Sequence, residues 1–346
     1  MLRQKITSGE IPGGEYLPPL RELSKDYGVT RKTMTKCLKV LEEEGLVRME
    51  PRCGCRVLAR ANDPTLGCPI AFIYGLDIAE EIRYGNFKPH HDFGQVLQKC
   101  AAGHGWSVLG VDPQSSNWKQ ILHQIRTAKA WGLVLNSVDR ELVTECGIYE
   151  LPVVVVDSWY EDQCVDTIIQ DNFQGGILAA RNLVEKGYKE VAWCGPVTAS
   201  IHSMERFSGA RMELNRLGAD IPDKYCYEVK SHNWKDLARE ILSDKNRPKA
   251  ILALWLHIST AIVSAAHELG LEPGVDFEMV GWAAGEEYER DYLPVFRGSG
   301  VQPAVFWDPM EMAEQALCRL EARRRTLNLT PVRINIPASL KLPEES

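Results

Sequence analysis

The 346-residue sequence has no apolar segment long enough to cross a membrane. Its longest apolar runs, Leu151–Val156 and Ala250–Leu256, are far shorter than the roughly 20 residues that span a bilayer. The first six residues include charged side chains and lack the apolar core of a secretion signal. We therefore predict a protein that is neither exported nor embedded in a membrane, with a cytoplasmic location.

The sequence also lacks clustered metal ligands and familiar catalytic motifs. Its ten cysteines include no CxxC pair and no Cys/His group with zinc spacing, and His90-His91-Asp92 is better interpreted as a solvated loop. Cys53 and Cys55 are too close for an ordinary structural disulfide, which favours free thiols. The GxSxG, GxGxxG, P-loop and HExxH patterns are absent. We predict no metal, no cofactor and no enzymatic activity.

Charge is present but unevenly distributed along the chain. Residues 1–60 hold 12 Lys and Arg against 8 Asp and Glu, whereas the whole chain carries a net charge of −7. The first 60 residues are therefore at +4 and the remainder is at −11. A basic head on an acidic body favours nucleic-acid binding by the head alone, because DNA repels the body.

The pattern of the first 60 residues predicts helix, turn, helix and hairpin. A helix is expected over 17–28 with Gly28 as its stop, and a second helix is expected from the cap Thr30 to Gly45. The apolar stripe of that second helix comprises Met34, Cys37, Leu38 and Leu41. Two short strands, Leu46–Glu50 and Cys55–Ala59, follow around a basic turn. This order is typical of a winged helix-turn-helix, whose second helix reads the major groove.

These residues resemble the DNA-binding domain of the GntR family. The matching elements include Leu17-Pro18, Arg21-Glu22-Leu23, Gly28-Val29-Thr30-Arg31 and Gly45-Leu46. The resemblance implies that Arg21 contacts DNA, that Arg31 reads a base, and that the wing tip enters the minor groove. The predicted DNA-binding residues are Arg21, Thr30, Arg31, Lys32, Thr35, Lys36, Arg52 and Gly54.

Two departures from the GntR pattern affect this part of the chain. Pro19-Leu20 replaces the Ser-Glu that usually precedes the arginine, which removes a helix cap. Thr35 stands where part of the family has a second arginine in the recognition helix, so the base preference is expected to differ.

Residues 61–67 contain turn and breaker residues without periodicity and are predicted to form a linker. Beyond them, short β-branched runs alternate with helical patterns, which is typical of parallel sheets covered on both faces. The runs are Ile70–Tyr74, Ser107–Val111, Gly132–Leu135, Pro152–Val156, Glu190–Cys194, Ala250–Leu254 and Glu278–Gly281. The fold class is therefore α/β, with a winged helix at 1–60 and a body at 68–346.

The order and spacing of several segments resemble the effector domain of the LacI family, which is similar to periplasmic sugar-binding proteins. The segments include "LPVVVVDS", "DTIIQDNFQGG", "MERFSGARMELNRLG" and "DFEMVGWA". The resemblance implies two Rossmann-like lobes, one over about 68–160 and 284–327 and the other over about 161–283 and 328–346. The chain is expected to cross between them near 158–165, 282–300 and 328–331, with a ligand bound at the strand ends between the lobes.

The resemblance also implies which residues contact an effector. Arg206 matches a sugar-contacting arginine, Gln302 a polar residue of the last crossing, and Trp234 an aromatic position that stacks on the ligand. Asp171 is equally well interpreted as a helix cap. The predicted effector residues are Trp159, Asp171, Arg206, Trp234, Trp255, Trp282 and Gln302.

Apolar residues replace two polar positions of this family. Trp255-Leu256 stands in place of an Asn-Asp pair, and Ala283 stands in place of an aspartate. We therefore expect an effector-responsive repressor that binds an inverted-repeat operator as a homodimer. The effector is expected to be a sugar or sugar derivative. A degenerate sensor that binds DNA constitutively stays open as an alternative, and an enzyme fused to a DNA-binding head is a less favoured one.

Overall fold

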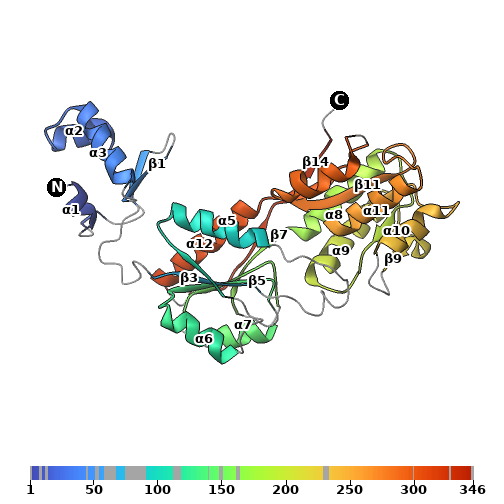
Figure 1. Cartoon of the computed structure of the whole chain (residues 1–346), viewed down its shortest axis with the longest axis horizontal. Coiled ribbons are helices and arrows are strands. Elements are labelled where there is room, and N and C mark those ends of the chain that lie inside the picture. Colours follow the sequence, from blue (N-terminus) through green and yellow to red (C-terminus); the bar gives the residue numbers. More distant parts are fainter. Residues whose placement is uncertain are drawn as a thin grey trace. The chain divides into compact units, whose positions relative to one another are not determined.

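The computed structural model describes residues 2–7, 10–11, 15–43, 46–50, 54–57, 68–74, 91–111, 118–138, 140–147, 151–160, 164–228, 234–298, 300–326 and 329–343 (Figure 1). The predicted linker 61–67, the wing residue Arg52 and His90 lie outside these residues. Within them, no helix combines the length and apolar character needed to span a membrane. The chain divides into two compact units, Met1–Phe72 with Leu97–Leu133, and Ile73–Val96 with Val134–Ser346.

The N-terminal residues form the two predicted helices and the predicted hairpin, with a further helix before them. The elements are α1 (Leu2–Thr7), α2 (Leu20–Asp26), α3 (Arg31–Glu43), β1 (Val47–Glu50) and β2 (Gly54–Val57), with β1 and β2 antiparallel. Their small core is formed by Leu2, Ile6, Leu17, Leu23, Met34, Leu38, Leu41, Val47, Cys55 and Val57. Cys37, expected in the apolar stripe, is exposed instead. The stripe of α3 is therefore narrower than the sequence predicts, since Met34, Leu38 and Leu41 alone reach this core.

The body has the predicted α/β architecture, with two six-stranded sheets. The first has the order β13-β7-β6-β5-β3-β4. Its strands are β3 (Ile70–Tyr74), β4 (Val108–Val111), β5 (Gly132–Asn136), β6 (Val153–Val156), β7 (Asp166–Gln170) and β13 (Arg333–Ile336). The accompanying helices are α5 (His91–Gly103), α6 (Trp118–Thr127), α7 (Arg140–Gly147) and α12 (Pro309–Arg325). Every residue of β5, β6 and β7 is buried, as expected of parallel strands covered on both faces.

The second sheet has the order β14-β12-β11-β10-β8-β9. Its strands are β8 (Ala192–Cys194), β9 (Cys226–Tyr227), β10 (Ala250–Ala253), β11 (Glu278–Ala284), β12 (Ala304–Trp307) and β14 (Ser339–Lys341). Figure 1 shows α8 (Asn172–Glu185), α9 (Ile201–Arg216), α10 (Trp234–Ser243) and α11 (Leu256–Glu268) around this sheet. The short helical turns Asp223–Tyr225, Tyr288–Tyr292 and Leu293–Phe296 complete the second lobe.

The chain crosses between the two sheets at different residues from those predicted. Strand β7 pairs in parallel with β6 and β13, so the first crossing follows Gln170 rather than lying near 158–165. Strand β12 pairs with β11, so the second crossing follows Trp307. Strand β13 belongs to the first sheet and β14 to the second, which puts the third crossing after Ile336. The predicted lobe boundaries were therefore wrong, because an apolar run reveals burial but not the sheet that a strand joins.

Two of these crossings are hydrogen-bonded to each other. The amide of Asp171 donates to the carbonyl oxygen of Ile336 at 2.7 Å. The amide of Ala338 donates to Oε1 of Gln174 at 2.8 Å. The first and third connections between the sheets therefore run together as a paired segment.

Helices α8 and α9 approach each other closely because glycines line their contact. A Cβ added at Gly176 would meet the backbone oxygen of Arg206 and lie 2.8 Å from the amide nitrogen of Ala210. A Cβ at Gly209 would meet the backbone of Phe173. This close packing fixes the position of Arg206 relative to the start of α8.

A buried ionic cluster attaches α12 to the first sheet. Asp166, at the start of β7, is fully buried and forms ion pairs with Arg319 at 2.7 Å and with Arg323. Its other carboxylate oxygen accepts a hydrogen bond from the amide of Val332 at 2.9 Å. One carboxylate therefore joins the helix, strand β7 and the segment that leads into β13.

Candidate functional site

Helix α3 presents a basic, exposed face. Arg31, Lys32 and Lys36 are exposed, whereas the opposite side of the helix faces the small core. Oγ1 of Thr30 accepts a hydrogen bond from the amide of Thr33 at 3.2 Å, which is the predicted N-cap. Gly28, with φ +62°, makes the left-handed turn that separates α2 from α3. The local sequence thus orients the start of α3, with Arg31 as its first residue, toward solvent.

Of the other predicted DNA-binding residues, some are exposed and some have a local structural role. Arg21 is exposed in the first turn of α2, and Pro19 supplies no side-chain cap to that helix, as its sequence predicts. The hydroxyl of Thr35 donates to the carbonyl oxygen of Arg31 at 2.9 Å, within the same helix. Gly54 opens β2 with φ +115°. This conformation favours glycine at the turn end of the hairpin.

In the body, Arg206 is a residue of α9, and its guanidinium lies at the carboxyl end of β10. The residue is buried, with 2% of its surface exposed. Its Nε donates to Oδ1 of Asn172 at 2.7 Å, and its Nη1 donates to the carbonyl oxygen of Leu254 at 2.8 Å. The guanidinium carbon lies 4.3 Å from the ring centre of Trp282 and 5.5 Å from that of Trp307. Two indoles and two hydrogen bonds therefore hold this cation in one orientation.

The start of α8 positions the partners of Arg206. Asp171 caps this helix by accepting a hydrogen bond from the amide of Gln174 at 2.8 Å, so its carboxylate has a structural role. Nδ2 of Asn172 donates to the carbonyl oxygen of Gln170 at 3.1 Å, which leaves Oδ1 directed at Arg206. Gly175 is required behind Trp282, because a Cβ there would lie 2.6 Å from the indole.

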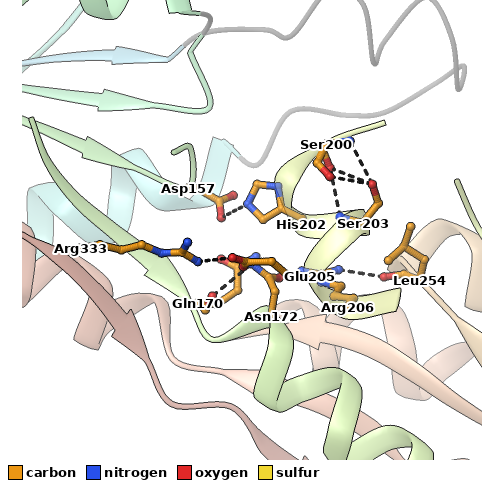
Figure 2. A network of polar contacts seen from close by, with 10 residues as sticks. All are labelled: Asp157, Gln170, Asn172, Ser200, His202, Ser203, Glu205, Arg206, Leu254 and Arg333. Atoms are coloured by element: carbon orange, nitrogen blue, oxygen red, sulfur yellow. Dashed lines mark hydrogen bonds and ion pairs between the residues drawn. The ribbon is translucent and has the colours of Figure 1, made fainter. Parts of the chain in front are cut away.

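Helix α9 also forms two polar contacts with residues of the first sheet and its connections (Figure 2). Nε2 of His202 lies 2.9 Å from Oδ1 of Asp157, the residue that follows β6. Nη2 of Arg333 donates to Oε1 of Glu205 at 2.6 Å, and the guanidinium of Arg333 stacks over Trp159 at 4.9 Å. Trp159 therefore lies close to Glu205, because Arg333 contacts both residues.

Two predicted effector residues, Trp234 and Gln302, have other surroundings, whereas Trp255 directly follows Leu254, whose carbonyl oxygen accepts from Arg206. Trp234 is 5% exposed and belongs to the apolar core of the second lobe. The ring of Trp255 stacks on His257, with centroids 5.5 Å apart, at the start of α11. Gln302 accepts from the amide of Met279 at 3.0 Å and donates to the carbonyl oxygen of Gly300 at 3.0 Å. Met279 lies near the start of β11, so Gln302 is at the amino end of the strands, opposite Arg206.

Gln302 therefore does not lie beside Arg206, whereas the sequence analysis did not select Trp307, Asn172, Glu205 and Arg333, which lie on or near Arg206. Trp307 is the residue that ends β12, the strand that Gln302 precedes. The sequence alone does not reveal whether a polar residue beside a strand lies at the end of the sheet that binds ligand, because polar residues flank strands at both ends. Glu205 and Arg333 are separated by 128 residues, and no local signal relates them.

Residues 1–57 match the family described as bacterial regulatory proteins, gntR family. Residues 90–272 match periplasmic binding proteins and the sugar binding domain of the LacI family. Similar relatives are the HTH-type transcriptional repressors PurR of Mannheimia succiniciproducens, 22% identical over 134 residues, and of Klebsiella pneumoniae strain 342, 26% identical over 137 residues. Each match covers 38% of this chain and only 40% of the relative's length.

Solved structures of the same architecture cover more of the chain. The complex of transcriptional regulator CelR with cellobiose covers 95% of this chain and all of that chain, with TM-score 0.64 and 16% identity. A regulatory protein of the LacI family from Chloroflexus aggregans covers 80% of this chain and 98% of that chain, with TM-score 0.63 and 17% identity. These likenesses show the fold. The chain belongs to the family of periplasmic binding proteins and LacI-type sugar binding domains, and it carries a gntR-family regulatory domain at its N-terminus.

Proposed function

We propose that this chain is a DNA-binding transcriptional regulator whose operator affinity changes when a small molecule binds beside Arg206. The observation that carries the proposal is the exposed basic start of α3 in a chain that also holds a buried arginine among strand ends of two sheets. The named relatives are transcriptional repressors, which supports regulation over catalysis.

In this proposal α3 enters the major groove with Arg31 at the base edges. Lys32, Lys36 and Arg21 approach phosphates, Thr30 and Thr35 orient the start of the helix, and the wing with Arg52 and Gly54 approaches the minor groove. One such head makes few contacts, so a homodimer on an inverted repeat is the expected assembly. A monomer at micromolar concentration, with and without DNA, would contradict that assembly.

Arg31→Ala is expected to weaken specific operator binding by about 1–3 kcal/mol and to relax the preference at one base pair per half-site. The physical reason is the loss of a bidentate contact to guanine, which Arg31→Lys cannot restore. Lys36→Ala is the matched control, since loss of a phosphate contact weakens all sequences alike and lowers the salt slope by about one. Titration of randomised operators measures both effects. Unchanged base preferences in Arg31→Ala would exclude α3 as the reading helix.

The surroundings of Arg206 favour a modified or acidic sugar, or a glycoside with an apolar group, as the effector. Trp282 and Trp307 supply aromatic surface, and Ala283 and Leu256 supply no side-chain hydrogen bonds. A neutral monosaccharide gripped only there would leave hydroxyls unpaired at about 1–3 kcal/mol each, whereas arginine forms strong bonds to a carboxylate. The effector regulates only if it binds the DNA-competent and incompetent conformations with different affinity.

An acidic sugar at 100 times its Kd is expected to stabilise the protein by about 2.7 kcal/mol, and this shift should vanish in Arg206→Ala. Arg211→Ala, an exposed arginine on the same helix, is the matched control. If the alanine variant folds poorly, Arg206→Lys replaces it. Lysine keeps the positive charge but cannot form the two parallel hydrogen bonds of a guanidinium to a carboxylate. Thermal unfolding against a metabolite panel provides the measurement. Tight binding of glucose, ribose or galactose that survives Arg206→Ala would refute the assignment.

A constitutive DNA binder is the second candidate, because apolar residues stand at 255, 256 and 283. The same panel distinguishes the two candidates. A constitutive regulator binds operator DNA, and none of the compounds alters its unfolding temperature or its DNA affinity.

A further inference from the structure

Gln170, which the sequence analysis did not select, is a buried polar side chain with an unsatisfied acceptor. It is the last residue of β7 and is 3% exposed. Its Oε1 has no hydrogen-bond partner among the residues that the structure describes. Buried amide oxygens are normally paired, so one that is not requires an explanation. Leucine of similar size would fill the position without a desolvated oxygen.

Glu205 offers a second acceptor of the same kind. Its Oε1 pairs with Arg333, whereas its Oε2 is buried and has no hydrogen-bond partner in the described part of the chain. A single chain of contacts relates it to Gln170. The carbonyl of Gln170 binds Asn172, whose side chain accepts from Arg206, and Glu205 precedes Arg206 on α9. Figure 2 shows Gln170, Asn172 and Glu205 grouped beside Arg333.

The charges of this group determine which donors suit the two oxygens. The two arginines that contact this group, Arg206 and Arg333, are cationic, and Arg333 already pairs with Glu205. An ammonium group placed at Glu205 would approach guanidinium groups, which disfavours it. Hydroxyl groups donate hydrogen bonds without adding charge. They are therefore the donors best suited to the free oxygens of Glu205 and Gln170.

We infer that Gln170 and Glu205 are specificity-determining residues of the effector site, and that their free oxygens accept hydrogen bonds from ligand hydroxyls. This inference rests on the proposed effector site and narrows its ligand to a polyhydroxylated molecule, with the acidic group at Arg206. Carboxylates without hydroxyls leave both oxygens unpaired and are rejected.

Gln170→Leu tests this inference most directly, because it removes the unpaired acceptor without breaking a described side-chain hydrogen bond. Glu205 variants would disturb Arg333 as well. Asn182→Leu is the matched control, since Oδ1 of Asn182 is also buried and without a hydrogen-bond partner in the described residues, but it lies three turns along α8 from Asn172. The full chain is tested with hexuronates, aldonates and neutral hexoses, and with cyclohexanecarboxylate as the hydroxyl-free acid.

Without ligand, Gln170→Leu should unfold at the same temperature as the wild type or higher. Hydroxylated ligands that bind the wild type should lose about tenfold in affinity in Gln170→Leu and nothing in Asn182→Leu, while cyclohexanecarboxylate binds neither. Calorimetry measures these affinities. A marked fall in unfolding temperature, equal affinities of the two proteins for the sugars, binding of cyclohexanecarboxylate, or a panel in which no hydroxylated compound binds the wild type would each overturn the inference. Operator binding by the wild type, measured separately, tests the proposed regulatory function whatever the ligand result.

Discussion

Asp166→Ala is expected to lower the free energy of unfolding of the body by about 3–5 kcal/mol. The carboxylate is fully buried between Arg319 and Arg323, and its removal leaves two guanidinium groups without their shared counter-charge. The amide of Val332 also loses its acceptor. The loss should appear in urea denaturation followed by circular dichroism, and α12 should be the first helix to lose hydrogen-exchange protection.

Asp236→Ala is the control for this effect. Asp236 pairs with Arg239 at 3.2 Å, but its side chain is 67% exposed, so solvent screens the pair. Its replacement should cost no more than about 1 kcal/mol. Equal losses in the two variants would show that the Asp166 cluster contributes no more than a surface ion pair.

Gly176→Ala is expected to destabilise the second lobe by about 3 kcal/mol, at the upper end of ordinary overpacking. Alanine favours a helix over glycine by about 1 kcal/mol, but its Cβ would meet the backbone of α9 at Arg206 and Ala210. A backbone cannot rotate away as a side chain does, so the two helices must separate. We expect the variant also to lose binding of any effector that requires Arg206.

Gly110→Ala is the matched control, because a Cβ there would meet nothing within 4 Å. Its effect on unfolding should stay within about 0.5 kcal/mol. A stabilised Gly176→Ala protein with normal ligand binding would show that α8 and α9 can move apart without consequence for Arg206.

The sequence predicted those parts of the fold that local patterns encode. Apolar periodicity located α3, and β-branched runs located strands such as β6 and β10. Arg206 was selected from a local motif, and its role in effector binding stays a prediction. Gln302 was expected beside it but lies at the amino end of the sheet, and the crossings depend on strand partners distant in sequence.

The remainder of the site could not be predicted because it is formed by tertiary contacts. Asn172 joins Gln170 to Arg206, and Arg333 reaches Glu205 from a strand near the C-terminus. Even the tryptophans illustrate this limit. Trp234 and Trp282 are both buried, but only Trp282 lies against the guanidinium of Arg206.

The hydrogen bonds that pair the first and third crossings restrict how the two lobes can move. With Asp171 bonded to Ile336, and Ala338 bonded to Gln174, the adjoining strands cannot slide past each other without breaking these bonds. Bending around a line through both crossings preserves them, so a hinge is the low-cost motion. Arg206 and Asn172 lie close to that line, so the proposed effector would bind near the axis of this motion. Displacement grows with distance from the axis, so modest closure at the ligand would become a large movement at remote parts of each lobe.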